Sequence, residues 1–484
     1  MAQVGVAVRS RHGRLPAALR AALLRLPERA RIARIPARVT SVPDPDPKPG
    51  NQLVPSTRPF ASRSGIAGWC LYDWANSPFA AIVLTFVIPA YFASAVLADD
   101  GAAQADWGFM VGTASFVVAV ISPILGAVAD RTGRRKAWIA GSAVVMIVAT
   151  GLLWWGEPGP HSATWILWWS GVGVVAFELG LVFYNALLPG LGPRDRLGRI
   201  SGTAWATGYL GGMACLVLAL FGIVLAEPPP LGLDPDQGEH VRITGPLVAV
   251  WMALFSLPLF LWTRDIPTRR MPAPAAVQAG VKKLYRDLVG MFADPERRIV
   301  GRYLVARMIY TDGINTVFAF GGIYAAAVIG MTVSEVIQFA ILVNITAGIG
   351  AFVFGRVDDS LGAKPTILIG LVAITALSIC MLLISTQILF LVVGAILGVF
   401  FGPVQSASRS LMARLTPAGE EAEAFGLYAL SGKVTAFVGP WLVGAATLAT
   451  GSERWGLATV LPFLIIGALL LLRVPDPSRR PLPA

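Results

Sequence analysis

The sequence predicts an all-α integral membrane protein in which twelve transmembrane helices form two pseudo-symmetric bundles of six. Of its 484 residues, 55% are hydrophobic and only 14% are charged, and the mean hydropathy is +0.66. A soluble globular protein carries about a quarter charged residues. The apolar stretches are long enough to cross a bilayer, and a polar pattern in the first of them returns in the seventh, which indicates an internal duplication.

The first span, at 66–92, is apolar except for a short polar pattern. Asp73, Asn76, Ser77 and Ala80 are spaced i, i+3, i+4 and i+7, so a helix places them on one face. An ionised carboxylate at this depth costs roughly 2.5 to 3.5 kcal/mol even on the lenient insertion scale. We therefore expect this face to line protein or a water-filled cavity, and we favour a functional role for Asp73 over a purely structural one.

The seventh span repeats this pattern 239 positions later. The matched positions are Asp73 and Asp312, Asn76 and Asn315, Ser77 and Thr316, Phe79 and Phe318, and Ala80 and Ala319. We interpret the two spans as the first helices of homologous halves, which would place two carboxylates opposite each other across a pseudo-two-fold axis.

The remaining spans complete six helices in each half. In the first half we expect them at about 105–129, 136–156, 163–190, 201–226 and 246–262, and in the second at about 303–329, 334–355, 364–384, 387–412, 424–449 and 455–473. The predicted domains are thus an N-terminal bundle, 65–262, and a C-terminal bundle, 303–473.

Three segments lie outside the bundles. Residues 1–64 are basic and contain no apolar core, so we expect a disordered cytoplasmic tail rather than a signal peptide; a transit peptide, a membrane-surface helix and a start codon assigned too early are the alternatives. Residues 263–302 are expected to form a cytoplasmic linker with an amphipathic helix on the membrane surface. Residues 474–484 form a second cytoplasmic tail.

The distribution of charge predicts the orientation. The net charge is +11, but the basic residues gather at the ends of spans rather than on a soluble face, which argues against nucleic acid as a partner. The basic loops lie on the side of both termini, so the positive-inside rule predicts a cell-membrane protein with cytoplasmic termini. The three cysteines have no metal-ligand spacing, and we expect no metal, no cofactor and a monomer in contact with membrane lipid.

A short motif follows the second span, GAVADRTGRRK from Gly126 to Lys136. Glycines allow a tight turn and a close approach of helices, and Asp130 can cap the positive N-terminus of a neighbouring helix. The arginines would hold acidic partners or only set the topology. A degenerate copy occurs 229 positions later, and a further correspondence at an offset of 224 pairs Pro193, Gly202 and Gly208 with Pro417, Gly426 and Gly432.

The motif matches the loop signature of the major facilitator superfamily, in which it acts as a conformational latch. The resemblance implies the major facilitator fold and a gating role for one set of residues: Gly126, Asp130, Arg131, Gly133, Arg134, Arg135 and, in the degenerate copy, Asp359. Within the superfamily the chain resembles the vacuole-effluxer-like family, which includes autophagy-linked vacuolar amino-acid exporters. This resemblance rests on YDWANS at 72–77 and on the stretches 189–202, 406–417 and 425–440.

The chain departs from the wider superfamily in two places, because the fourth span lacks the arginine of many proton-coupled members and the fifth lacks the Gly-Pro signature of antiporters. The fourth span instead carries Glu178, and the eleventh carries Lys433. If spans 1, 4, 7, 10 and 11 line a cavity as in the superfamily, these two residues meet Asp73 and Asp312 there. The predicted solute or ion site is Asp73, Asn76, Glu178, Asp312, Asn315 and Lys433, whereas Asn185, Gln405 and Arg409 are given structural roles.

These features predict a secondary transporter that moves a small polar solute by alternating access, and not an enzyme. Carboxylates and an ammonium in one cavity suit an amino acid or similar zwitterion. Burial favours the neutral form of a carboxylate, so a proton is the expected coupling ion, with sodium as the alternative. Three other functions stay open: a sugar or organic-ion symporter, a membrane-embedded lipid-modifying enzyme and a non-transporting receptor.

Overall fold

The computed structural model describes residues 60–97, 100–265 and 295–475, together with scattered positions between 278 and 290. All regular secondary structure in this part of the chain is helical. The predicted N-terminal tail, the linker helix within 263–302 and the C-terminal tail lie almost entirely outside the described residues, so these predictions stay untested.

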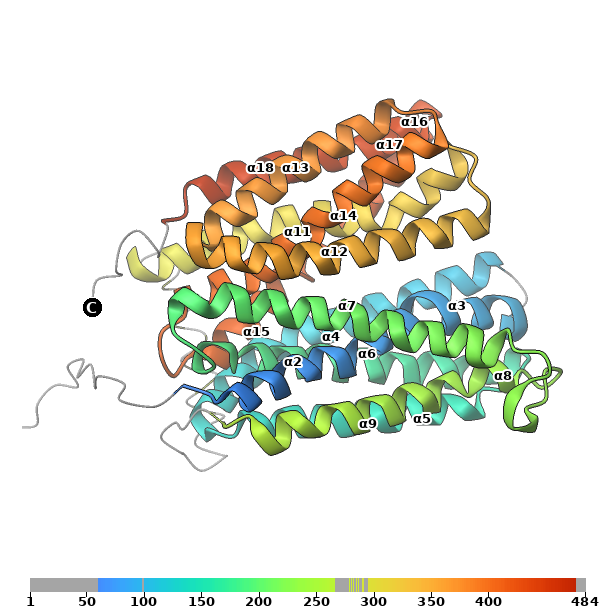
Figure 1. Ribbon diagram of the computed structural model, residues 1–484, viewed down its shortest axis with the longest axis horizontal. Coiled ribbons are helices and arrows are strands. Elements are labelled where there is room, and N and C mark those ends of the chain that lie inside the picture. Colours follow the sequence, from blue (N-terminus) through green and yellow to red (C-terminus); the bar gives the residue numbers. More distant parts are fainter. Residues whose placement is uncertain are drawn as a thin grey trace, which may run out of the picture. The chain divides into compact units, whose positions relative to one another are not determined.

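The N-terminal half, residues 63–262, packs eight α-helices together (Figure 1). They are α2 (Arg63–Pro78), α3 (Val87–Tyr91), α4 (Asp100–Thr132), α5 (Arg135–Leu152), α6 (Ala163–Asn185), α7 (Leu197–Ala219), α8 (Glu239–Arg242) and α9 (Thr244–Trp262). Helix α2 packs against α7 and α9, while α6 packs against α4 and α5. The interfaces bury large apolar side chains such as Trp69, Phe79 and Phe183.

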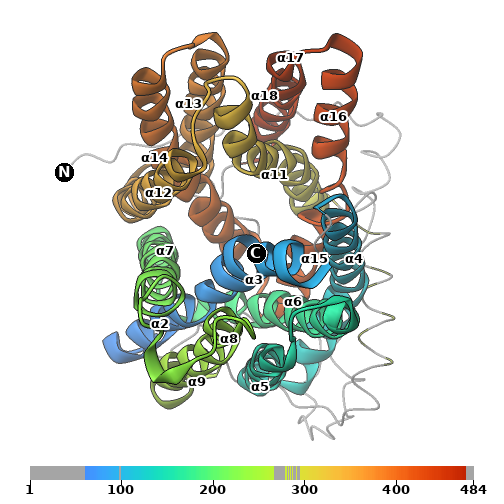
Figure 2. The same cartoon turned by 90° about the vertical axis from the view of Figure 1, so that its right-hand side faces the viewer.

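The C-terminal half, residues 295–472, contains the other eight described helices. They are α11 (Pro295–Ala327), α12 (Val333–Leu361), α13 (Ala363–Leu383), α14 (Gln387–Leu415), α15 (Glu421–Ser431), α16 (Val438–Thr450), α17 (Glu453–Ala458) and α18 (Val460–Leu472). Figure 2, which looks along the helices, shows α11 to α14 and α16 to α18 on one side of the molecule, whereas α15 lies beside α4 of the N-terminal half. They meet where α12 and α14 contact α7 and where α15 contacts α4.

Ten stretches in the described part of the chain are long and apolar enough to cross a membrane. The two other predicted spans are both helical but fall short of that standard. Helix α11 is continuous, but the charged residues Arg302, Arg307 and Asp312 interrupt its apolar sequence. The predicted span 424–449 is divided into α15 and α16. The structure therefore has the predicted all-helical membrane fold, while the count of twelve spans is not fully confirmed.

The expectation of one continuous helix over 424–449 is wrong, because residues 432–437 form turns between α15 and α16. A Cβ at Gly432 would lie 3.0 Å from the Arg307 guanidinium, so a glycine here lets the chain pass close to this group. Irregular backbone at membrane depth is tolerated where it is buried in protein or lines a cavity. This break places Lys433 in the middle of the bundle.

The first span is also irregular. Helix α2 ends at Pro78, and the chain continues as the π-helical segments Phe79–Phe86 and Phe92–Leu97 on either side of α3. The hydroxyl of Thr85 donates to the carbonyl oxygen of Ala80, five residues earlier, at 2.8 Å. Proline removes a backbone donor, and π turns often occur at functional sites.

The two motif copies lie mostly on helices, not in the predicted loops. Helix α4 continues to Thr132 and α5 begins at Arg135, so only Gly133 and Arg134 connect them. Gly133 has a φ of 63°, a conformation that favours glycine. Helix α12 likewise continues to Leu361, which places Asp359 on its last turn. These helices extend beyond the apolar spans, and their final turns are stabilised by contacts of Asp130 and Asp359 with the opposite half.

Candidate solute site and the contacts between the halves

A cavity of about 600 Å³ lies between the two halves and is lined by side chains from both. Its polar and charged lining includes Asp73, Asn76, Glu178, Asn185, Arg307, Asn315, Gln405, Arg409 and Lys433. Of the six predicted site residues, the structure brings five to this cavity. No group of three or more metal-ligating side chains occurs among the residues that the structure describes.

One ion pair crosses between the halves at the inner wall of the cavity. Arg409 Nη1 donates to Asp73 Oδ2 at 3.1 Å and to Asn185 Oδ1 at 3.3 Å. Its Nε and Nη2 donate to the side chain and the carbonyl of Ser201, at 2.9 and 2.8 Å. The guanidinium also lies 4.9 Å from the centre of the Trp69 ring. The groups that accept these hydrogen bonds from Arg409 all belong to the N-terminal half.

Arg409, Asn185 and Gln405 all line the cavity, which corrects the structural roles that the sequence suggested for them. The expected neighbours of Asp73 were Glu178, Asp312 and Lys433, whereas its observed ion partner is an arginine 336 positions away. One signal was present in the sequence: the offset of 224 that relates Pro193 to Pro417 also relates Asn185 to Arg409. The duplicated position thus carries an amide in one half and a cation in the other, and the two side chains touch.

A second ion pair between residues that line the cavity crosses between the halves. Lys433 Nζ lies 2.7 Å from Glu178 Oε1, and the side chains are 26% and 19% exposed. These partly exposed charges face the cavity, whereas Asp73 and Arg409 are almost fully buried. The second pair is therefore the more accessible to an entering solute.

Asp312 does not line the cavity, so the expectation that it joins Asp73 there is wrong. The residues of α11 that line the cavity are Arg307, Thr311, Ile314, Asn315 and Phe318. The last four repeat the i, i+3, i+4, i+7 spacing of Asp73, Asn76, Ser77 and Ala80, but one residue earlier than the duplication predicts. Since neighbouring helical residues point about 100° apart, Asp312 turns towards the protein interior and is 2% exposed.

Arg307 is a cavity residue that the sequence did not single out. Its Nη1 donates to the carbonyl oxygen of Tyr428 at 2.7 Å and to Ser431 Oγ at 2.8 Å, and the guanidinium stacks 3.4 Å from the centre of the Tyr428 ring. Its Nε has no hydrogen-bond partner among the described residues. The cavity wall therefore combines three cations, Arg307, Arg409 and Lys433, with two carboxylates, Asp73 and Glu178.

The first motif copy forms a buried contact between the halves, which we call the first inter-half cluster: Asp130, Arg135, Glu421 and the N-terminus of α15. Asp130 accepts backbone N–H groups of Ala422 and Glu423 at 3.0 and 2.8 Å. Arg135 Nη2 lies 2.6 Å from Asp130 and 2.5 Å from Glu421. The carboxylate thus caps the neighbouring helix as the sequence suggested. Arg134 is exposed and Arg131 is partly buried.

The second motif copy forms the second inter-half cluster: Asp358, Asp359, Arg414, Ser410 and Arg199. Asp358 pairs with Arg414 and accepts the Ser410 hydroxyl, and all three are buried. Asp359 accepts the backbone N–H and the Nε of Arg199, both at 3.2 Å, near the N-terminus of α7. Asp358 was missed, although the doubled aspartate in GRVDDSLGAK was visible in the sequence.

The fold is shared with solved transporters of the major facilitator superfamily. The E. coli fucose:proton symporter FucP is 14% identical, with a TM-score of 0.65 over 86% of this chain and 100% of that chain. The proton:xylose symporter XylE is also 14% identical, with a TM-score of 0.63 over 86% of this chain and 95% of that chain. At this level of identity the likeness concerns the fold.

Two sequence relatives are more informative. An uncharacterised MFS-type transporter of Bacillus subtilis, YxiO, is 24% identical over 414 residues, which cover 84% of this chain and 94% of that protein. Autophagy-related protein 22 of Cryptococcus neoformans is 28% identical over 296 residues, 57% of this chain and 50% of that protein. The match thus spans about half the length of the fungal relative.

The family comparison covers most of the chain. The family described as "Vacuole effluxer Atg22 like" matches residues 108–480, which include both inter-half clusters, Glu178 and Lys433. Together with the helical membrane fold, this match shows that the chain belongs to the Atg22-like vacuole effluxer family of major facilitator transporters.

Proposed function

We propose that this protein is a secondary transporter that moves a small zwitterionic solute, an amino acid in the first instance, through the central cavity by alternating access. The observation that carries the proposal is the pair of ion pairs, Asp73 with Arg409 and Glu178 with Lys433, that cross between the halves within one cavity. A solute bound between them would contact both halves at once.

The Glu178–Lys433 pair matches the charges of a zwitterion. A solute ammonium group can replace Lys433 beside Glu178, while the solute carboxylate can replace Glu178 beside Lys433. Neither protein charge is then left unpaired, which would be costly in a desolvated site. Arg307 also lines the cavity, and its guanidinium offers a further positive charge to a carboxylate. A neutral solute would leave these charges as they are.

The proposed coupling ion is a proton. Asp73 and Glu178 are the carboxylates among the residues that line the cavity, and each belongs to an ion pair that crosses between the halves. Protonation of either one would weaken an ion pair between the halves, and so would link proton binding to their separation. In the proposed orientation, in a cell membrane, the end with the inter-half clusters faces the cytoplasm, and the clusters act as gates that close this end.

The test is solute flux in proteoliposomes with a panel of amino acids, sugars and organic anions, with and without a pH gradient. We expect amino-acid flux that depends on the gradient and is lost in Asp73→Asn and Lys433→Met. Asp195→Asn, at an exposed carboxylate away from the cavity, is the matched control and should behave as the parent.

Flux of a sugar or organic anion alone would contradict the zwitterion proposal. Amino-acid flux that ignores the pH gradient, a protonophore and sodium would contradict the coupling. Chemical conversion of a lipid without flux would favour the enzyme alternative.

A further inference from the structure

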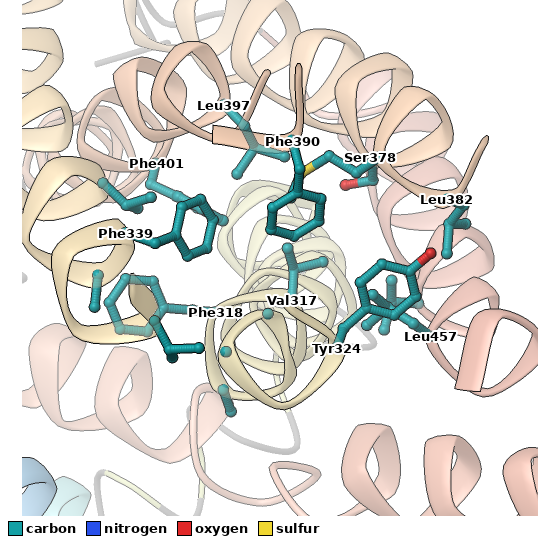
Figure 3. Close-up of a pocket in the computed structure, with 18 of the residues that line it drawn as sticks. Val317, Phe318, Tyr324, Phe339, Ser378, Leu382, Phe390, Leu397, Phe401 and Leu457 are labelled. Atoms are coloured by element: carbon teal, nitrogen blue, oxygen red, sulfur yellow. The ribbon is translucent and has the colours of Figure 1, made fainter. Parts of the chain in front are cut away.

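A second cavity, of about 230 Å³, lies within the C-terminal half (Figure 3). Helices α11, α12, α13 and α14 supply most of its wall, and α17 and α18 close one side. The lining is almost entirely apolar, in contrast to the central cavity. None of the charged side chains discussed above reaches it.

Aromatic rings give this cavity a defined shape. Phe390 packs between Tyr324 and Phe339, with ring centres 6.0 and 5.2 Å away. Phe339 lies directly on Gly394, where any side chain would collide with the ring. On another side, Phe318 and Phe401 meet edge to face at 5.8 Å. Because these contacts fix the rings, the cavity is formed before any ligand arrives.

Phe318 and Phe401 also line the central cavity, so this aromatic pair stands between the two spaces. The second cavity is therefore separate from the proposed solute site, but it adjoins that site through a wall that both share.

Two hydroxyl groups in the wall lack a hydrogen-bond partner among the described residues: Tyr324 Oη and Ser378 Oγ. Their side chains appear in Figure 3 among the lining residues, and the residues are only 2% and 6% exposed. A buried hydroxyl without a hydrogen-bond partner is energetically unfavourable. A helical serine usually avoids this cost by donating to a carbonyl of the preceding turn, as Ser408 does here, but Ser378 does not.

We propose that this cavity is a binding site for a small apolar molecule that carries one hydroxyl group, such as an alkylphenol. The aromatic and aliphatic wall holds the apolar body, while Tyr324 and Ser378 exchange hydrogen bonds with the hydroxyl. An engineered apolar cavity of about 150 Å³ takes up benzene, so the larger volume here accommodates a ring with a short alkyl chain.

The site also depends on the conformation of the protein. Thr85 and Phe86, from the π-helical segment of the N-terminal half, complete its wall. A movement of one half against the other removes these residues from the site. A bound molecule therefore stabilises the present arrangement and slows the transport cycle. This last step rests on the proposed function, whereas the binding itself does not.

The binding test is the melting temperature of the purified protein in detergent, titrated with 4-butylphenol and with butylbenzene, which lacks the hydroxyl. We expect 4-butylphenol to raise the melting temperature saturably and to bind more tightly than butylbenzene. Tyr324→Phe and Ser378→Ala should each weaken 4-butylphenol binding about fivefold, the contribution of one hydrogen bond, and leave butylbenzene binding unchanged.

A cavity-filling variant controls for non-specific partition of the probes. Gly321 lines the cavity, and a Cβ there would meet no atom within 4 Å, so the position has room for the larger side chain of Gly321→Leu. Gly444→Leu is the matched control, since Gly444 is equally open but lies outside the cavity. Only Gly321→Leu should abolish the stabilisation.

The proposed site would be overturned if the probes still stabilised Gly321→Leu. It would also be overturned if neither probe stabilised the parent protein, which would leave the cavity a space for water only. Equal binding of the two probes would overturn the role of the hydroxyls. In proteoliposomes, 4-butylphenol should lower the maximal flux of the parent but not of Gly321→Leu. If no solute is transported at all, the proposed function fails while the melting data still decide the binding site.

Discussion

The two inter-half clusters are copies of one design with different burial of charge. In each, an aspartate near the end of one helix accepts a backbone N–H at the start of a helix from the opposite half, at α15 in the first cluster and at α7 in the second. The side chains of Asp130, Arg135 and Glu421 in the first cluster are at most 7% exposed. In the second, Arg414 and Asp358 are equally buried, but Arg199, whose side chain pairs with Asp359 across the interface, is 53% exposed.

This difference shows that the duplication preserved the helix-capping geometry but not the ion pairs around it. Removal of one partner from a buried ion pair leaves an uncompensated charge and costs about 3 to 5 kcal/mol. A solvent-exposed ion pair contributes roughly 0 to 1 kcal/mol. We therefore expect the two clusters to contribute unequally to the closed state at this end of the molecule.

The largest effect is expected for Arg135→Met, which leaves Asp130 and Glu421 buried without their shared cation. The cost of breaking a buried pair, with about 1.4 kcal/mol per tenfold change in an equilibrium constant, implies an increase of about a hundredfold or more in the open population. The measurement is the rate of maleimide labelling of Ser122→Cys, in a background without the three native cysteines. Ser122 is fully buried and donates to Gly426 across the interface.

Labelling of this variant at the parental rate would remove the first cluster from the closing of this end. Circular dichroism and gel filtration should show that the fold is retained, because the change acts on the contact between the halves.

An intermediate effect is expected for Arg414→Met in the second cluster. This change removes the partner of Asp358 within the C-terminal half and the hydrogen bond from Arg414 Nε to the carbonyl oxygen of Arg194 across the interface, while Asp359 keeps Arg199. We expect the same reporter to be labelled about tenfold faster, because one hydrogen bond from a charged group across the interface is lost. An effect as large as that of Arg135→Met would show that the two clusters are equivalent in spite of their different exposure.

The smallest effect is expected for Arg199→Ala. The exposed side chain contributes no more than about 1 kcal/mol, and its backbone N–H still bonds to Asp359 after the substitution. Labelling should rise less than about fivefold and should be insensitive to added salt in the variant. A rise comparable to that of Arg414→Met would mean that exposure is a poor guide to the strength of these contacts.

Much of this architecture could be predicted because local patterns determine it. Glycine spacing and a single aspartate located the capping contact at Asp130, and the repeated polar pattern identified the two halves. Long apolar stretches gave most of the helices. Each of these signals is a pattern of residues within a single helix or a short connecting segment.

The composition of the cavity was harder to predict, because it depends on how helices are rotated against each other. The pattern that contains Asp312 fixes a face relative to its own helix, and a shift of one residue turned that face away from the cavity. The partner of Asp73 lies 336 positions away, and no local period relates the two. The break at Gly432 lies against the Arg307 guanidinium, and this too is a contact between distant segments.

The glycines at the interface have a mechanical consequence that does not involve charge. A single methyl group at Gly202 would strike the carbonyl oxygen of Ala351, and one at Gly426 would strike that of Ser122. Both obstacles are backbone atoms, which cannot rotate aside as a side chain can. We therefore expect Gly202→Ala to act as a wedge, which a parental labelling rate at Ser122→Cys would disprove. At this end the two halves pack so closely that there is no room between them for one methyl group. Even an alanine side chain is therefore enough to prevent their full closure.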